Sequence, residues 1–201
     1  MTASDLINII GTAAFTLAGY LVGVRKRLDI LGVLICALLT AVGGGMMRDV
    51  LVGRIPAVFT EYSSLLVIAV TLAAAWFLKL QNSQRRVLAE AFAWADSLGL
   101  VAFTIIGAQI GLDYGLNIFG VVMTGFVTAV GGGIVRDMLI NDIPVIMREG
   151  FYGSVAVIVG IAVCLLDFLN MVHPFTLQVL LISGYVLRMW AYKIHLRLPK
   201  P

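Results

Sequence analysis

Charged residues are scarce in this chain of 201 residues. Asp, Glu, Lys and Arg together make up 12% of the sequence, whereas soluble domains carry about 25%. Hydrophobic residues make up 61%, and the mean hydropathy is +1.02. A soluble domain of this length would leave much of that apolar surface in water, where it promotes aggregation. The composition therefore predicts an integral membrane protein.

Residues that carry most enzyme chemistry are also few. The two cysteines, Cys36 and Cys164, lie in apolar runs, where a free thiol packs as a small hydrophobe. The two histidines, His173 and His195, are isolated, so they do not suggest a metal site. The sequence has no serine-histidine-acid grouping and no nucleotide-binding loop. We therefore expect no enzyme activity, no disulfide and no cofactor.

Long apolar runs, in contrast, are abundant. A membrane-spanning helix needs about 20 mostly apolar residues, and seven stretches qualify. They lie near residues 5–24, 30–52, 62–80, 92–111, 117–140, 151–170 and 174–193. The connections between them are too short to separate two domains. The sequence thus predicts an all-α membrane protein with seven transmembrane helices in a single domain over residues 1–201.

Basic residues indicate the orientation, because Lys and Arg near helix ends stay on the cytoplasmic side. The formal net charge is only +3, which favours this role over nucleic-acid binding. One side collects Arg25, Lys26, Arg27, Lys79, Arg85, Arg86, Arg136, Arg148, Lys193, Arg197 and Lys200. The other side has Arg48 and Arg54. We therefore expect the N-terminus outside and the C-terminus in the cytoplasm.

The sequence repeats itself with an offset of 88 residues. Residues 40–49 (TAVGGGMMRD) align without a gap on residues 128–137 (TAVGGGIVRD). The same offset pairs Gly11 with Gly99, Phe15 with Phe103, and Pro56 with Pro144. Repeat one covers about residues 5–80, repeat two about 92–170, and the seventh helix, about 174–193, has no counterpart. Because three helices are an odd number, the second copy starts from the other face and the two copies are inverted.

Each repeat places three successive glycines deep in its second helix: Gly43, Gly44 and Gly45, and Gly131, Gly132 and Gly133. A glycine costs about 1 kcal/mol relative to alanine in a helix interior. We expect these glycines to break or kink the second and fifth helices. In hydrocarbon the freed backbone groups must meet protein or water, so the broken segments would line a path for a small ion or polar solute. The alternative is that the glycines only let the helices pack closely.

Polar residues near these glycines are candidates for supporting or lining that path. Arg48, Asp49, Arg136 and Asp137 follow the glycines by one turn and must pair or face water at membrane depth. We expect the arginines to support and gate the path by donating to freed carbonyls, with direct cation contact by the aspartates as the weaker alternative.

The sequence also offers expectations for three further sets of polar residues. Asp96, the repeat counterpart of Asn8, is expected in a vestibule or as a helix cap. Thr16 and Thr104 are expected to bond their own helix backbone, with exposure to the path as the alternative. Arg188 is expected to extend to the cytoplasmic surface.

The duplicated Gly-Gly-Gly-x-x-Arg-Asp segments resemble those of the trimeric intracellular cation channels, in particular the prokaryotic homologues. That family also includes proteins described as bacterial glycine transporters. The resemblance covers nearly the whole chain and includes the three-plus-three-plus-one arrangement and the turns at Ile55-Pro56 and Ile143-Pro144.

The resemblance implies a homotrimer in a prokaryotic plasma membrane, with membrane lipid as a further partner and a separate pore in each protomer. It also implies conduction of potassium, with sodium tolerated, along a path between the second and fifth helices. Animal members carry a Lys-Glu-Val sequence that helps bind an inositol lipid. Here the region reads Gly-Gly-Gly-Met-Met-Arg-Asp, so that lipid is not expected.

Three functions follow from these observations. A monovalent cation channel is the leading hypothesis. A secondary transporter of a small zwitterion such as glycine would use the same inverted repeats and half-helix dipoles. A membrane scaffold whose glycines only tighten helix contacts would move neither solute.

Overall fold

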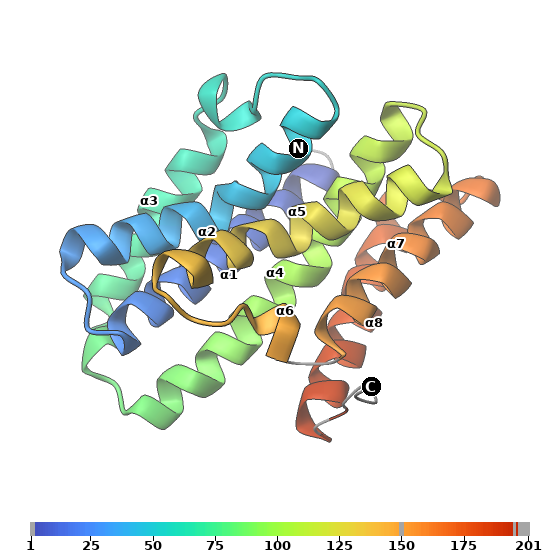
Figure 1. Ribbon diagram of the computed structural model, residues 1–201. Helices are drawn as coiled ribbons and strands as arrows, with labels where there is room; N and C mark the ends of the chain where they lie inside the picture. The colour runs from blue at the N-terminus through green and yellow to red at the C-terminus, as the bar shows by residue number, and fades with distance from the viewer. Residues whose placement is uncertain (1–2, 149–150, 195, 197–201) are drawn as a thin grey trace.

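The computed structural model describes residues 3–148, 151–194 and 196. Figure 1 shows the long helices of this part of the chain: α1 (Ala3–Arg25), α2 (Ile30–Leu51), α3 (Ser63–Phe77), α4 (Arg85–Asp113), α5 (Ile118–Leu139), α7 (Tyr152–Phe168) and α8 (Pro174–Lys193). Three short elements lie in the connections: η1 (Ala57–Phe59), η2 (Leu80–Asn82) and α6 (Val145–Arg148). The described residues contain no strand, which confirms the all-α class.

The helices also bear out a membrane protein. By length and composition α1, α2, α4 and α5 can each cross a bilayer. Helices α3 and α7 are apolar but shorter, with 15 and 17 residues, and α8 has 20 residues. The start of α1 and the end of α8 lie toward opposite sides of the molecule in Figure 1, upper and lower in that view. Seven crossings would place these helix ends in this way, and the number of crossings stays a prediction.

Side-chain caps explain why α2 and α5 begin where they do. The Asp29 carboxylate accepts a hydrogen bond from the Gly32 N–H at 2.7 Å. The Asn117 amide oxygen accepts one from the Gly120 N–H at 2.9 Å. Each cap satisfies a backbone donor of the first turn that has no partner within the helix. Asp29 and Asn117 are separated by the repeat offset, so the two helices start at equivalent positions.

The fourth helix begins at Arg85 and not near residue 92 as the apolar run predicts. Its first turns are polar, and on their exposed side Arg86 Nε lies 3.1 Å from Glu90 Oε1. Such a pair, four residues apart, supports a helix in water. These charged residues therefore leave the first seven residues of α4 out of the apolar run, although Leu88 among them is buried.

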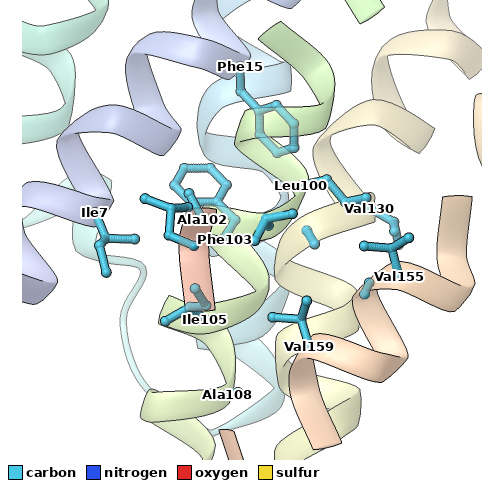
Figure 2. Packing of buried hydrophobic residues seen from close by; sticks show 14 of the residues in the cluster. Ile7, Phe15, Leu100, Ala102, Phe103, Ile105, Ala108, Val130, Val155 and Val159 are labelled. Atoms are coloured by element: carbon cyan, nitrogen blue, oxygen red, sulfur yellow. The ribbon is translucent and has the colours of Figure 1, made fainter. Parts of the chain in front are cut away.

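The centre of the core lies on α4. Leu100, Val101, Ala102 and Ile105 are fully buried, and α4 packs most extensively against α1 and α5. Figure 2 shows Leu100, Ala102 and Ile105 between Ile7 of α1 and the labelled valines of α5 and α7. Helix α4 of the second repeat thus lies between α1 of the first repeat and the other helices of its own repeat.

Both triple glycines lie inside uninterrupted α-helix, so the predicted helix break is wrong. Helix α2 runs without interruption from Ile30 to Leu51, and α5 from Ile118 to Leu139. The backbone of the glycine turns therefore stays helical and is not released to line a path. The glycines lower helix propensity, but close contact with a neighbouring helix offsets that loss. A bend without a break at these positions stays a prediction.

Candidate functional site

Helices α2 and α5 cross with their backbones in contact at the triple glycines. A Cβ atom added to Gly44 would overlap the carbonyl oxygen of Thr128. One added to Gly132 would overlap the carbonyl oxygen of Thr40. The repeat offset exchanges these two contacts, since it relates Gly44 to Gly132 and Thr40 to Thr128. The close-packing alternative therefore describes the second glycine of each motif.

The third glycine of each motif has a different neighbour. A Cβ on Gly45 would lie 3.6 Å from Nη2 of Arg48, and one on Gly133 would lie 3.7 Å from Nη2 of Arg136. Each arginine therefore folds back over the turn that precedes it on its own helix. The guanidinium groups were expected to donate to carbonyls freed by a break, but with the helices intact they pair with carboxylates.

In the first repeat the carboxylate of Asp49 holds two arginines. Arg48 Nη2 and Arg54 Nη2 lie 2.7 Å and 2.8 Å from Asp49 Oδ1. The Ala57 N–H donates to Asp49 Oδ2 at 3.0 Å. Asp49 thus ties the end of α2 to the segment that leads into α3. Because Asp49 is 1% exposed, these bonds provide the pairing that a buried charge needs.

In the second repeat the arginine is the shared group. Arg136 Nε donates to Asp137 Oδ1 at 2.8 Å, and Arg136 Nη1 lies 3.7 Å from Asp96 Oδ1. The Val145 N–H donates to Asp137 Oδ2 at 3.0 Å, which matches the Ala57 bond of the first repeat. The hydroxyl of Tyr152 lies within hydrogen-bonding reach of Asp96.

The two clusters therefore differ in composition. The first joins two arginines, Arg48 and Arg54, to one aspartate, Asp49. The second joins two aspartates, Asp96 and Asp137, to Arg136, and Arg188 lines the same cavity as Asp96. The difference arises because Asp96 has the neutral Asn8 as its counterpart, and Arg54 has the acidic Asp142.

Asp142 lies in the turn after α5, outside the helices. Lys26 Nζ lies 3.0 Å from Asp142 Oδ2, and Arg148 Nη1 lies 3.4 Å from Asp142 Oδ1. The hydrogen bond from Lys26, helped by the charge of Arg148, lowers the pKa of the Asp142 carboxyl below its ordinary value. Asp142 thus links the turn between α1 and α2 to the end of α5.

Three polar cavities open around these clusters. The Asp49 cavity, of about 70 Å³, is lined among others by Asn8, Thr12, Arg48, Asp49, Phe103 and Thr128. The Asp142 cavity, of about 240 Å³, is lined among others by Arg25, Lys26, Arg85, Asp137, Asp142 and Arg148. The Asp96 cavity, of about 310 Å³, is lined among others by Arg25, Phe92, Asp96, Arg148, Arg188 and Tyr192. The last two share several lining residues, and neither shares one with the Asp49 cavity.

Several predicted positions are corrected by this geometry. Asp96 cannot cap α4, because that helix begins eleven residues earlier, at Arg85; it lies buried at the Asp96 cavity. Arg188 does not extend to a surface: it is 4% exposed, and its guanidinium lies 4.9 Å from the ring centre of Tyr152. His195, Arg197 and Lys200 lie outside the described residues.

The two threonines form the expected bonds to their own helices. The Thr16 hydroxyl donates to the Thr12 carbonyl, and the Thr104 hydroxyl to the Leu100 carbonyl, both at 2.7 Å. Both threonines are fully buried, and neither lines the three polar cavities. Exposure to a path is therefore not seen in this conformation.

Arg54 and Asp142 are site residues that the sequence reasoning missed as partners. Arg54 was read only as a topology signal, and Asp142 was not singled out. A signal was present, since the two are repeat counterparts of opposite charge directly before the Ile-Pro turns.

Comparison with known proteins gives consistent results. A family profile described as "Glycine transporter" matches residues 5–81 and 93–167, two segments whose starts differ by the repeat offset. A "UPF0126 membrane protein" of Deinococcus radiodurans is 38% identical over 155 residues, 75% of this chain and 70% of that protein. The "UPF0126 inner membrane protein YadS" of Escherichia coli K12 is 31% identical over 194 residues, 96% of this chain and 93% of that protein.

Solved structures agree with these relatives. A trimeric intracellular cation (TRIC) channel orthologue from Rhodobacter sphaeroides superimposes with a TM-score of 0.87 at 29% identity, covering 98% of this chain and 100% of that one. A prokaryotic TRIC channel crystallised in 0.5 M KCl gives a TM-score of 0.84 at 31% identity, covering 97% of this chain and 98% of that one.

Proposed function

Because the chain belongs to the glycine transporter family and shares the fold of the TRIC channels, we propose that it is a homotrimeric, potassium-permeable channel for monovalent cations. The observation that carries this proposal is the likeness to TRIC cation channels along nearly the whole chain. In the proposal the chain forms one transmembrane domain of seven crossings. Its two inverted repeats supply one pore in each protomer. The proposed activity needs no chemical step, so the protein is not an enzyme.

The proposed path runs beside the crossing of α2 and α5. The Asp49 cavity opens it at one end, and the Asp96 and Asp142 cavities open it at the other. The packed core between them closes the path in this conformation. Opening requires α2 and α5 to move at Gly43, Gly44 and Gly131, Gly132, where little side-chain bulk resists sliding. Bending at these glycines is the form of movement we favour.

The charged clusters hold the ends of the moving helices. Arg48 with Asp49 fixes the end of α2, and Arg136 with Asp137 fixes the end of α5. We assign these four residues a supporting and gating role, because their polar atoms are largely occupied by one another. Asp96 is the carboxylate that a passing cation would meet in the Asp96 cavity, where Arg25, Arg148 and Arg188 supply the neighbouring positive charge.

The channel proposal is tested with purified protein in planar bilayers. Potassium currents are expected, with smaller sodium currents and none when both ions are replaced by a large organic cation. The Gly44→Leu and Gly132→Leu variants should lose conduction, because leucine would fill the crossing point. Lack of current at every voltage from protein that is trimeric and folded would refute the proposal.

A second candidate function is transport of a small zwitterion such as glycine. The observation that favours it is the Asp96 cavity, which is lined by a carboxylate, Asp96, and a guanidinium, Arg188. Opposite charges at one cavity suit the ammonium and carboxylate ends of an amino acid. Saturable counterflow of labelled glycine in proteoliposomes, lost in Asp96→Asn, would support this function over a channel. If neither potassium current nor glycine counterflow is detected, the protein acts as a membrane scaffold.

Orientation and partners complete the proposal. The end that carries Lys26, Arg85 and Arg148 faces the cytoplasm of a prokaryotic cell by the positive-inside rule, which leaves the N-terminus outside. An apolar groove of about 530 Å³ between α1, α2 and α3, lined among others by Leu34, Leu72 and Trp76, is where we place a membrane lipid. Light scattering of the detergent-solubilised protein tests the trimer. Cysteine labelling at Arg85 and Tyr62 in intact cells tests the orientation.

A further inference from the structure

Two phenylalanines from equivalent positions of the repeat meet at the centre of the protein. The ring of Phe15 on α1 and the ring of Phe103 on α4 have centroids 5.1 Å apart and planes inclined at 81°. This edge-to-face arrangement is the favourable one for two aromatic rings. The side chains are 1% and 5% exposed, and Figure 2 shows both in the core beside Leu100.

Each ring rests on a glycine of the opposite helix. A Cβ on Gly99 would overlap the ring of Phe15, and a Cβ on Gly11 would lie 2.8 Å from two ring carbons of Phe103. Gly11 and Gly99 are repeat counterparts, as are the two phenylalanines. The absence of a side chain at both glycines therefore lets each ring approach the helix of the other repeat closely.

The ring pair occupies the layer that separates the cavities. Along α4, Asp96 lines the Asp96 cavity and Phe103 lines the Asp49 cavity. These two residues are about 10 Å apart along the helix axis at 1.5 Å per residue. Gly99, on which Phe15 rests, lies between them. On α1 the order is reversed: Asn8 and Thr12 line the Asp49 cavity, and Phe15 lies deeper.

We propose that Phe15 and Phe103 form a hydrophobic gate that closes the path between the Asp49 cavity and the Asp96 cavity. This inference rests on the proposed function only in requiring that a path joins the two cavities. The rings offer no group that replaces the hydration shell of an ion, and apolar constrictions of this kind close a pore by excluding water. Opening requires at least one ring to leave its glycine.

Thiol accessibility tests the gate without relying on conduction. Cys36 and Cys164 are free and are replaced by alanine. A single reporter is then introduced, either Ala93→Cys in the Asp96 cavity or Ser64→Cys in the Asp49 cavity. Silver ion, a monovalent cation that reacts with thiols, is added outside spheroplasts, and the remaining free thiol is counted with a maleimide after solubilisation.

The gate predicts that only the reporter on the side of addition reacts quickly in the parent protein. Combining Phe15→Ala with Phe103→Ala should speed reaction of the far reporter at least tenfold. Ile105→Ala is the matched control, because it also removes a fully buried side chain from α4 but lines none of the polar cavities. It should leave the rate unchanged. The milder pair Phe15→Leu and Phe103→Leu serves where the alanine variant does not fold, and should give a smaller increase.

An unchanged rate in the folded phenylalanine variants, or an equal increase in Ile105→Ala, would overturn the gate. Potassium flux is measured on the same variants. Faster labelling without flux supports the gate and refutes the channel. If the parent conducts potassium and the phenylalanine variants change neither the flux nor the labelling rate, the gate is refuted and the channel proposal stands.

Discussion

Alanine substitutions at Gly44 and Gly45 should have opposite effects on stability, although the two glycines are neighbours in one helix. Both variants gain about 1 kcal/mol of helix propensity. A methyl group on Gly45 meets its nearest neighbour, Arg48 Nη2, at 3.6 Å, which is an ordinary contact. A methyl group on Gly44 overlaps the backbone oxygen of Thr128, and a backbone atom cannot rotate away as a side chain can. Overpacking of this kind costs about 1–3 kcal/mol.

The difference between the two variants isolates the overpacking cost, because the propensity gain is common to both. We therefore expect Gly44→Ala to be less stable than Gly45→Ala by about 1–3 kcal/mol. Denaturation of the purified protein in mixed micelles with increasing SDS, followed by circular dichroism, measures this difference. In the second repeat, Gly132→Ala and Gly133→Ala should behave in the same way. Equal stability of Gly44→Ala and Gly45→Ala would refute backbone contact at the crossing.

Three further predictions use the same denaturation assay. Arg136→Ala should lower the free energy of unfolding by about 3–5 kcal/mol, because Asp96 and Asp137 lose the cation they share. Arg48→Ala should lower it less, because Arg54 still pairs with Asp49. Equal losses of stability in the two variants would contradict this account. The lowered pKa of Asp142 means that its stabilising effect is full above its ordinary pKa and is lost as the pH falls through the lowered value. The parent should therefore lose stability below about pH 4 more steeply than Asp142→Asn, and identical pH profiles would count against the link. Tyr20→Phe removes the 2.8 Å bond to Gln81 Oε1 and should cost about 0.5–1.5 kcal/mol, while Tyr62→Phe at an exposed position should change nothing.

The apolar runs predicted the long helices well, because membrane length and hydropathy act on each helix separately. The caps at Asp29 and Asn117 explain why the starts of α2 and α5 were close to correct. The predicted start of α4 was wrong, since Arg85, Arg86 and Glu90 lower the hydropathy of the first turns although these turns are helical. A hydropathy profile detects apolar segments and does not detect the part of a helix that extends beyond them.

The triple glycines show a second limit of sequence reasoning. A run of glycines has no side chains, and both a broken helix and a close helix crossing are compatible with such a run. Only the position of the other helix decides between them. The contact of Gly44 with the backbone at Thr128 arises from a residue of the other repeat, and no local pattern in residues 40–49 contains that information.

Duplication also explains how one motif came to give two different charged centres. The shared Arg-Asp pair and the backbone N–H bonds to Asp49 and Asp137 keep both helix ends fixed in the same way. The residues that surround the pair are free to differ, because they are not needed for that anchoring. Asp96 in place of Asn8 gives the second centre a second carboxylate, and Arg54 gives the first centre a second guanidinium. In the proposed path this exchange would make the two ends chemically distinct. Asp96→Asn should therefore remove one carboxylate from the second centre while leaving the anchor of α5 intact, because Arg136 keeps its bond to Asp137.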